Sequence, residues 1–232
     1  MGWGLPGILG YLPSPTVVPK QQIPRTLEML SPGAKICDVG AGGRRITPDA
    51  VTVDFAAAPG VDIVGDIHSV PIADDEYDCV FCTGTLEHVR DPATAVKELH
   101  RILKPGAIVH IDVPFMQGYH PDPTDYWRFT LEGLRLLCRD FEEIDAGTYI
   151  GPTCGLVWIA REWANSWTSN RIVSNLLLVP MAILTAPFRY LDYAMIKSSR
   201  SHHVASAVYF RGRKPLAPAA AQIGTSSTFG KH

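Results

Sequence analysis

The sequence predicts an α/β fold with a doubly wound, mostly parallel sheet. Short apolar runs that end at glycine, aspartate or proline alternate with segments of helical periodicity. These runs are apolar at nearly every position, as expected of strands that are covered on both faces of a parallel sheet. The chain has 232 residues, of which 46% are hydrophobic, so it can form one such domain with an additional segment.

Seven strands are expected, six in the first part of the chain and one near its C-terminal end. Each is a short apolar run bounded by turn-forming residues. In chain order the runs are AKICDVG at 34–40, AVTVDF at 50–55, GVDIVGDI at 60–67, YDCVFCTG at 77–84, AIVHIDVP at 107–114, EEIDAGTYI at 142–150 and HVASAVYFRGRK at 203–214. Together they predict a seven-stranded sheet.

Two helices are expected between the later strands. Residues 92–106 place apolar side chains at helical spacing and end at Lys-Pro-Gly, which stops a helix. Residues 130–141 begin with Thr130, a favourable N-cap residue, and continue with a helical pattern.

A helical insertion is expected at about 150–202, where a minimal fold of this type needs no residues. The Trp-rich stretch 154–167 is helical in pattern, and 172–188 carries no charged residue. That run approaches the roughly 17–25 residues needed to span a bilayer, but Pro180 and Pro187 interrupt it. Three interpretations stay open: a kinked helix packed on the domain, an interfacial membrane anchor, or the surface of a homodimer.

The remaining boundaries follow from composition. Residues 1–34 are rich in Gly and Pro and are expected to cap the domain, which then spans 35–214. The low-complexity stretch 215–232 is expected to be a disordered tail.

The charge of the chain says something about its partners. The 21 basic and 23 acidic residues nearly balance, so no nucleic-acid partner is expected. Five scattered cysteines favour a reducing compartment, hence the cytoplasm, with or without contact to a membrane.

A glycine-rich stretch, DVGAGG, follows the first expected strand. Gly40 and Gly42 allow a ligand to approach the backbone closely, although such a pair alone is also typical of a structural turn. Asp54 ends the second strand, at the position where folds of this type bind ribose hydroxyls. Asp66 follows the third strand. The combination predicts a cofactor site along one edge of the sheet.

These motifs resemble the class I S-adenosylmethionine-dependent methyltransferases, type 11 subgroup, over about residues 34–147. The resemblance is carried by DVGAGG, VTVDF, VGDIHSVPIADDEYDCV, TGTLEHVRDPATAVKELHRILKPGA and IDVPF. It implies a Rossmann-like sheet and S-adenosylmethionine as the cofactor, with Asp54 on the ribose and His88 near the reactive end. The cofactor-binding residues that it implies are Asp38, Gly40, Ala41, Gly42, Asp54, Phe55, Asp66, Ile67, Thr83, Gly84 and Thr85.

Two departures from the family pattern concern the first helix. Arg44 stands where a third glycine is usual, and Asp54 follows Gly40 by only 14 residues (54 − 40). The first helix is therefore expected to be reduced to a turn. This shortened form resembles methyltransferases of bacterial glycan clusters, which carry text like HPDPTDYWRFT. The N-terminal segment and the Trp-rich insertion are the candidates to close the more open pocket.

The stretch YHPDPTDYWRF, Tyr119 to Phe129, follows the fifth strand at the sheet edge where ligands bind. A hydroxyl acceptor must be positioned within about 3–3.5 Å and lose a proton. His120 is the predicted base, with Asp125 orienting it and His88 as the alternative base. The predicted acceptor-binding residues are Tyr119, Asp122, Tyr126, Trp127 and Arg128.

Other interpretations of this loop stay open. His120, Asp122 and Asp125 could hold Mg²⁺ together with the hydroxyls of the acceptor. The aspartates could instead cap the turns made by the two prolines. Trp127 and Phe129 could belong to the core, and Arg128 could pair with Glu132.

The expected function is methyl transfer to a hydroxyl of a sugar or glycan. The expected partner is therefore a small-molecule or glycan acceptor. One alternative is a lipophilic acceptor, such as a quinone or lipid, because the run 172–188 is apolar and could contact a membrane peripherally. The other is a non-catalytic, cofactor-binding partner subunit.

Overall fold

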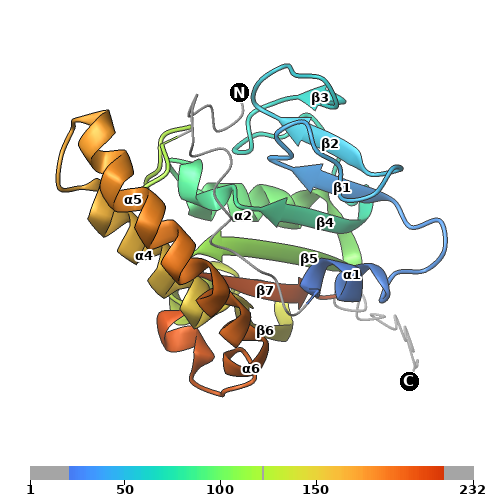
Figure 1. The fold of residues 1–232 in the computed structure, drawn as a ribbon. Coiled ribbons are helices and arrows are strands. Elements are labelled where there is room, and N and C mark those ends of the chain that lie inside the picture. Colours follow the sequence, from blue (N-terminus) through green and yellow to red (C-terminus); the bar gives the residue numbers. More distant parts are fainter. Residues whose placement is uncertain (1–20, 122, 217–232) are drawn as a thin grey trace, which may run out of the picture.

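The computed structural model describes residues 21–121 and 123–216, and it contains a seven-stranded sheet (Figure 1). The strand order is β3-β2-β1-β4-β5-β7-β6, in which β7 runs antiparallel to both of its neighbours. The strands are β1 (Ile36–Val39), β2 (Val51–Asp54), β3 (Ile63–Val64), β4 (Tyr77–Thr83), β5 (Leu103–Pro114), β6 (Glu142–Ile150) and β7 (Ala207–Arg213). The predicted seven-stranded, mostly parallel sheet is confirmed.

Two helices cover one face of this sheet. They are α2 (Pro92–Ile102) and α3 (Leu131–Leu137), which bury their apolar sides in the main core cluster. Asp91 caps α2 by accepting from Ala93 N and Thr94 N, and Thr130 caps α3 as expected. The helix predicted at 92–106 ends at Ile102, because Leu103 has an extended backbone and starts β5.

A short helix, α1 (Gln22–Leu27), lies on the opposite face. Thr26 Oγ1 lies 2.9 Å from His110 Nδ1 of β5 and accepts a 2.8 Å bond from Arg211 Nε of β7. Burial lowers the pKa of His110 to about 3, so its ring is neutral in this network. The described part of the predicted cap, 21–34, therefore covers a sheet face, while 1–20 lie outside the described residues.

Two connections at the β3 side of the sheet are short. Residues 40–50 contain no helix, which confirms that the first helix is reduced to turns. The third expected strand, 60–67, is limited to the two residues of β3. A Cβ on Gly65, the next residue, would lie 2.5 Å from Pro71 Cδ, so the chain packs against Pro71 directly after the strand. This side of the site is therefore bounded by loops.

The insertion lies between β6 and β7 and is helical (Figure 1). Its elements are α4 (Pro152–Asn165), α5 (Arg171–Thr185), η3 (Ala186–Leu191), α6 (Asp192–Met195) and η4 (Ser201–Val204). The buried Asp192 carboxylate accepts from Thr153 N and Cys154 N, which fixes the start of α4. A Cβ on Gly155 would lie 3.1 Å from Met116 O, so the first turn of α4 packs tightly against the segment after β5.

Candidate active site

The glycine-rich loop joins the end of β1 to the end of β2. Gly40 has a φ of +80°, and a Cβ there would lie 2.3 Å from the side chain of Thr85. Gly40 N donates to Val53 O at 2.8 Å, and Gly42 N donates to Asp54 Oδ2 at 2.8 Å. The loop therefore follows a path that only glycine accommodates at Gly40, and it is tied to β2.

The other predicted cofactor residues lie along the same edge of the sheet. Phe55 is exposed beyond β2, whereas Ile67 is half-buried and packs on the core. The Asp66 carboxylate accepts a hydrogen bond from His68 N and lies 2.6 Å from His68 Nδ1, and these interactions lower its pKa. Thr83 ends β4, and Gly84 and Thr85 follow it, where Thr85 Oγ1 donates to Gly40 O at 3.3 Å. The structure brings these residues to one edge.

Three buried carboxylates mark the middle of this edge. Asp38 lies near the end of β1, Glu87 lies in η2 (Leu86–His88) and Asp112 lies near the end of β5. These residues are only 3%, 3% and 7% exposed. Each has one oxygen without a hydrogen-bond partner among the described residues. Burial raises the pKa of Asp38 to about 6, and burial beside Glu87 raises that of Asp112 well above its usual value. A cation bound here would relieve this desolvation.

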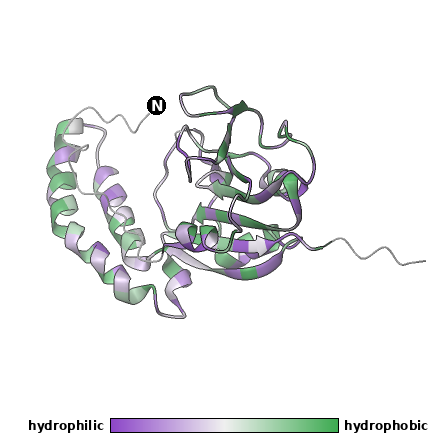
Figure 2. Ribbon diagram, turned by 90° about the vertical axis from the view of Figure 1, so that its right-hand side faces the viewer, coloured by the Kyte–Doolittle hydropathy of each residue, from purple (hydrophilic) through white to green (hydrophobic). Residues whose placement is uncertain are grey.

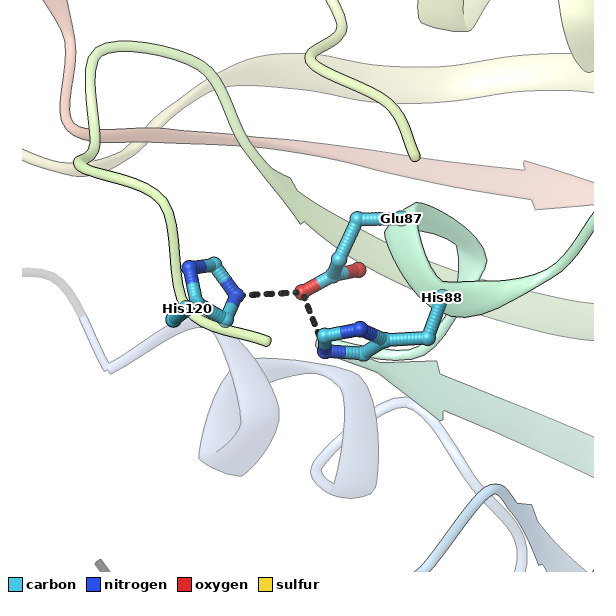
Figure 3. Close-up of side chains that lie close together, drawn as sticks. All are labelled: Glu87, His88 and His120. Carbon is cyan, nitrogen blue, oxygen red and sulfur yellow. Dashed lines mark ion pairs between the residues drawn. The ribbon is translucent and has the colours of Figure 1, made fainter. Parts of the chain in front are cut away.

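Glu87 also connects two histidines (Figure 3). Its Oε1 lies 3.6 Å from His120 Nε2 and 3.8 Å from His88 Nε2, and the two imidazole rings meet edge to face. The three side chains offer ligand atoms within 4.8 Å of one another, which suits a divalent metal ion as well as proton transfer. Sequence reasoning selected both histidines but not Glu87, although it directly precedes His88.

His120 lies between two carboxylates. Its backbone N–H donates to Asp125 Oδ2 at 3.0 Å, and its Nδ1 lies 3.1 Å from Gly118 O and 3.6 Å from Asp125 Oδ2. Burial disfavours the charged ring, but Glu87, the Gly118 carbonyl and Asp125 outweigh burial and raise the pKa of His120. At Nδ1 the Gly118 carbonyl can only accept, whereas Arg128 Nη2, 3.2 Å from the same nitrogen, can only donate, so the two contacts favour opposite tautomers. Nε2 is the ring nitrogen that faces Glu87.

Arg128 holds the loop that carries His120. Its Nη1 and Nη2 donate to Asp125 Oδ1 and Oδ2 at 2.5 and 2.6 Å, and Nη2 also donates to Gly118 O at 2.7 Å. Burial opposes the charge on Asp125, yet Arg128 and His120 lower its pKa. The alternative pairing of Arg128 with Glu132 is wrong, because the guanidinium is already engaged by Asp125 three residues away.

The aromatic residues of the loop form an open rim beside this cluster. Tyr119, Tyr126 and Trp127 are 67%, 45% and 43% exposed, and Trp127 Nε1 donates to Val89 O at 2.8 Å. Phe129 packs on the core as the alternative interpretation expected, whereas Trp127 does not lie in the core. Asp122 lies outside the described residues, so the predicted magnesium set of His120, Asp122 and Asp125 stays a prediction.

The insertion reaches the site through α4. The ring of Trp158 lies 6.3 Å from that of His120, and Gly118 lies against Trp158 and Glu162. Neither α4 residue, nor Asp112 in IDVPF, was selected from the sequence. Trp158 had no local signal because only the fold brings 158 and 120 together, whereas Asp112 was recognisable as an acid at the end of an apolar strand.

Comparison with known proteins places this edge in a family. Residues 38–111 match the family described as Methyltransferase domain, Methyltransf_11. This segment, from β1 into β5, carries the signature of a class I methyltransferase domain. The cyclase SpnF has the same fold, with a TM-score of 0.55 and 18% identity, over 84% of this chain and 80% of that one. Since SpnF is named a cyclase, the fold alone does not fix the reaction.

Curated relatives match shorter segments. Demethylmenaquinone methyltransferase of Renibacterium salmoninarum is 29% identical over 44% of this chain and 51% of its own length. Ubiquinone biosynthesis O-methyltransferase of Pseudomonas syringae pv. tomato is 31% identical over 33% of this chain and 43% of its own. The chain therefore spans about half the length, or less, of these curated relatives.

The residues present fit S-adenosylmethionine, the cofactor of this class of domain. Its sulfonium and ammonium groups are cations, and the three incompletely bonded carboxylates, Asp38, Glu87 and Asp112, lie at the centre of the edge. The open backbone at Gly42 and the carboxylate of Asp54 lie beside them, where the methionine part and the ribose would be held.

Proposed function

We propose that this protein is an S-adenosylmethionine-dependent O-methyltransferase that methylates a hydroxyl of a sugar or glycan. The observation that carries the proposal is the buried Glu87–His120 pair, held by Asp125 and Arg128 at the carboxyl edge of the sheet. Such a pair serves a hydroxyl acceptor, which must lose a proton as it is methylated.

The bound cofactor supplies an activated methyl group. The glycine loop and Asp54 would hold the cofactor, and the methyl group would pass to the acceptor oxygen as the hydroxyl loses its proton. His120 Nε2 would take up that proton. Glu87 Oε1, 3.6 Å away, stabilises the imidazolium that forms. At that distance the two groups form an ion pair rather than a direct hydrogen bond.

The aromatic rim supports a sugar as the acceptor. Tyr119, Tyr126 and Trp127 expose ring surface beside His120, and aromatic faces pack well against the apolar face of a sugar ring. Asp125 and Arg128 hold each other and the loop in this structure, so we assign them to positioning.

A second candidate function is methylation of a lipophilic acceptor. Two observations favour it: the extensive apolar surface of the insertion, and the names of the relatives, which concern menaquinone and ubiquinone. In this case the exposed aromatics would contact an isoprenoid or acyl chain.

The test supplies methyl-labelled S-adenosylmethionine with separate glycan and lipid fractions of cell extract. We expect label in the glycan fraction, loss of labelling in His120→Ala, and unchanged cofactor affinity of that variant in calorimetry. Label in the lipid fraction selects the second candidate, and cofactor binding without any labelling contradicts both. Loss of activity after treatment with a chelator would instead assign Glu87, His88 and His120 to a metal ion.

A further inference from the structure

The apolar side of α5 faces outward. Its buried residues are Ser174, Leu178 and Ala182, which recur every four positions on the side that packs on α4. The opposite side exposes Ile172, Leu176, Ile183 and Leu184, which are 74%, 69%, 62% and 69% exposed. A helix of a globular domain normally buries its apolar side, so this orientation calls for an apolar environment outside the molecule.

Polar contacts fix that orientation. Arg161 of α4 donates to Ala182 O at 3.1 Å, and Ser174 Oγ donates to Asn165 Oδ1. Rotating α5 to bury its leucines would break both contacts and bury leucine against these polar groups. The outward apolar side is therefore part of the fold.

Aromatic residues continue this surface. Trp163 and Trp167 join Leu177 and Met181 in an apolar pocket of about 320 Å³ between α4 and α5. Tyr193 of α6 is also exposed. We call the surface formed by Trp163, Trp167, Ile172, Leu176, Ile183 and Leu184 the apolar face. Figure 2 shows that the helices carrying it protrude from the sheet and that hydrophobic segments, in green, recur along them between hydrophilic ones.

The charges around the apolar face are mostly positive, with the exposed Glu162 beside Trp163 as an exception. Between positions 163 and 206 the basic residues are Arg171, Arg189, Lys197 and Arg200, and the only acid is Asp192. Asp192 is fully buried as the cap of α4, whereas Lys197 and Arg200 are exposed. The whole chain is negative by two charges, so the insertion is a local positive region that suits anionic headgroups.

From these observations we propose that the apolar face docks on the surface of an anionic lipid bilayer, with α5 lying in the interface. Tryptophan and tyrosine at the edge of an apolar surface, with basic residues around it, are typical of interfacial helices. The proposal does not depend on which acceptor is methylated. It places α4, which also touches the loop of His120 through Trp158, next to the lipid.

A membrane-spanning helix and a homodimer through the apolar face fit these observations less well. The segment Ile172–Met195 is apolar and long enough to cross a membrane by composition, but its α-helix α5 has only 15 residues, contains Pro180, and gives way to the 3-10 turn η3. A spanning helix needs about 20. In a two-fold dimer each apolar face would meet its own copy, which brings like basic groups together.

The test is sedimentation of the full chain with vesicles of phosphatidylcholine alone or with roughly one third phosphatidylglycerol. We expect at least tenfold more bound protein on the anionic vesicles, and weaker binding at high salt. The triple variant Ile172→Ser/Leu176→Ser/Ile183→Ser should lose at least tenfold of this binding. Leu136→Ser, which changes a leucine of α3 that is 65% exposed, is the matched control and should bind as the wild type does.

A second variant separates charge from apolar contact. Lys197→Glu/Arg200→Glu changes exposed side chains and should remove the preference for anionic vesicles. Wild-type protein that stays in the supernatant with both kinds of vesicle overturns the proposal. A wild-type dimer that the triple variant converts to monomer, in size exclusion with light scattering, overturns it in favour of a second copy of this chain.

Discussion

The two halves of the candidate active site satisfy their polar groups differently. In the cofactor half, formed by the ends of β1 to β4, Asp38 and Asp112 of the adjoining β5 keep one carboxylate oxygen each without a hydrogen-bond partner among the described residues. Glu87 of η2, at the boundary between the halves, likewise keeps one such oxygen. In the acceptor half, formed by residues 115–129 and α4, Asp125 and Arg128 bond to each other and to the loop. We infer that a bound ligand would complete the cofactor half, whereas the acceptor half is already held around His120 by Asp125 and Arg128.

The largest expected effect follows from removing the proposed base, His120. His120→Ala should lower turnover by about 10²–10⁴ while cofactor affinity stays the same, because His120 lies on the acceptor side of Glu87. Fixed-time assays with labelled cofactor measure turnover, and calorimetry measures cofactor affinity. His203→Ala, which changes an exposed histidine of the insertion, is the matched control. Near-normal turnover of His120→Ala would move the role to His88.

The second expected effect follows from removing Arg128, which holds Asp125 and the loop of the acceptor half in place. Arg128→Ala leaves the Asp125 carboxylate, whose side chain is 1% exposed, without its main partner and should destabilise the protein by roughly 1–3 kcal/mol. Turnover should fall with little change in cofactor affinity. Thermal unfolding and calorimetry measure both, with Arg135→Ala, at a half-exposed pair with Glu143, as the control. An unchanged melting temperature would show that the loop does not depend on this pair.

A substitution in the cofactor half should lower cofactor affinity and leave the stability of the acceptor loop unchanged. Asp54→Ala removes the carboxylate that accepts from Gly42 N, and it should weaken cofactor binding at least tenfold, about 1.4 kcal/mol, without destabilising the acceptor loop. Asp49→Ala, an exposed aspartate of the same connection, should bind normally. Calorimetry decides, and equal affinities of the two variants would contradict the ribose assignment.

The smallest expected effect is a pH dependence with opposite signs for activity and stability. Only neutral His120 accepts a proton, so turnover should rise with pH through its raised pKa. Protonated His120 stabilises the fold below its ordinary value of about 6.5, and this contribution is lost as pH rises through the folded-state pKa. Denaturant titrations of wild type and His120→Gln at several pH values measure the contribution of His120 to the free energy of unfolding. The same pH slope in both variants would exclude it.

The same contrast explains what the sequence could predict. Strands, the glycine loop and Asp54 were predictable because their signals are local: apolar runs, glycine after a strand, and an acid at a strand end. His120 was selected for its chemistry, but its partner Glu87 was not, because the pair is formed by two loops that only the fold brings together. Contacts from α4, such as Trp158, are equally non-local.

The insertion shows a second limit of sequence patterns. The pattern of 172–188 predicted an apolar helix and left three environments open. Helical periodicity identifies an apolar side but not the direction that it faces. The structure adds that direction through Ser174 and Arg161, whose polar contacts lie on the inner side.

The identity of the methylated product tests the central claim most directly. Wild-type protein and His120→Ala would be incubated with methyl-labelled cofactor and the glycan fraction, and the labelled product would be hydrolysed with mild alkali. The account predicts an alkali-stable methyl ether on a sugar with wild type, and a decrease of about 10²–10⁴ with His120→Ala. Label found instead in an alkali-labile methyl ester or in lipid, or equal labelling by both proteins, would contradict it.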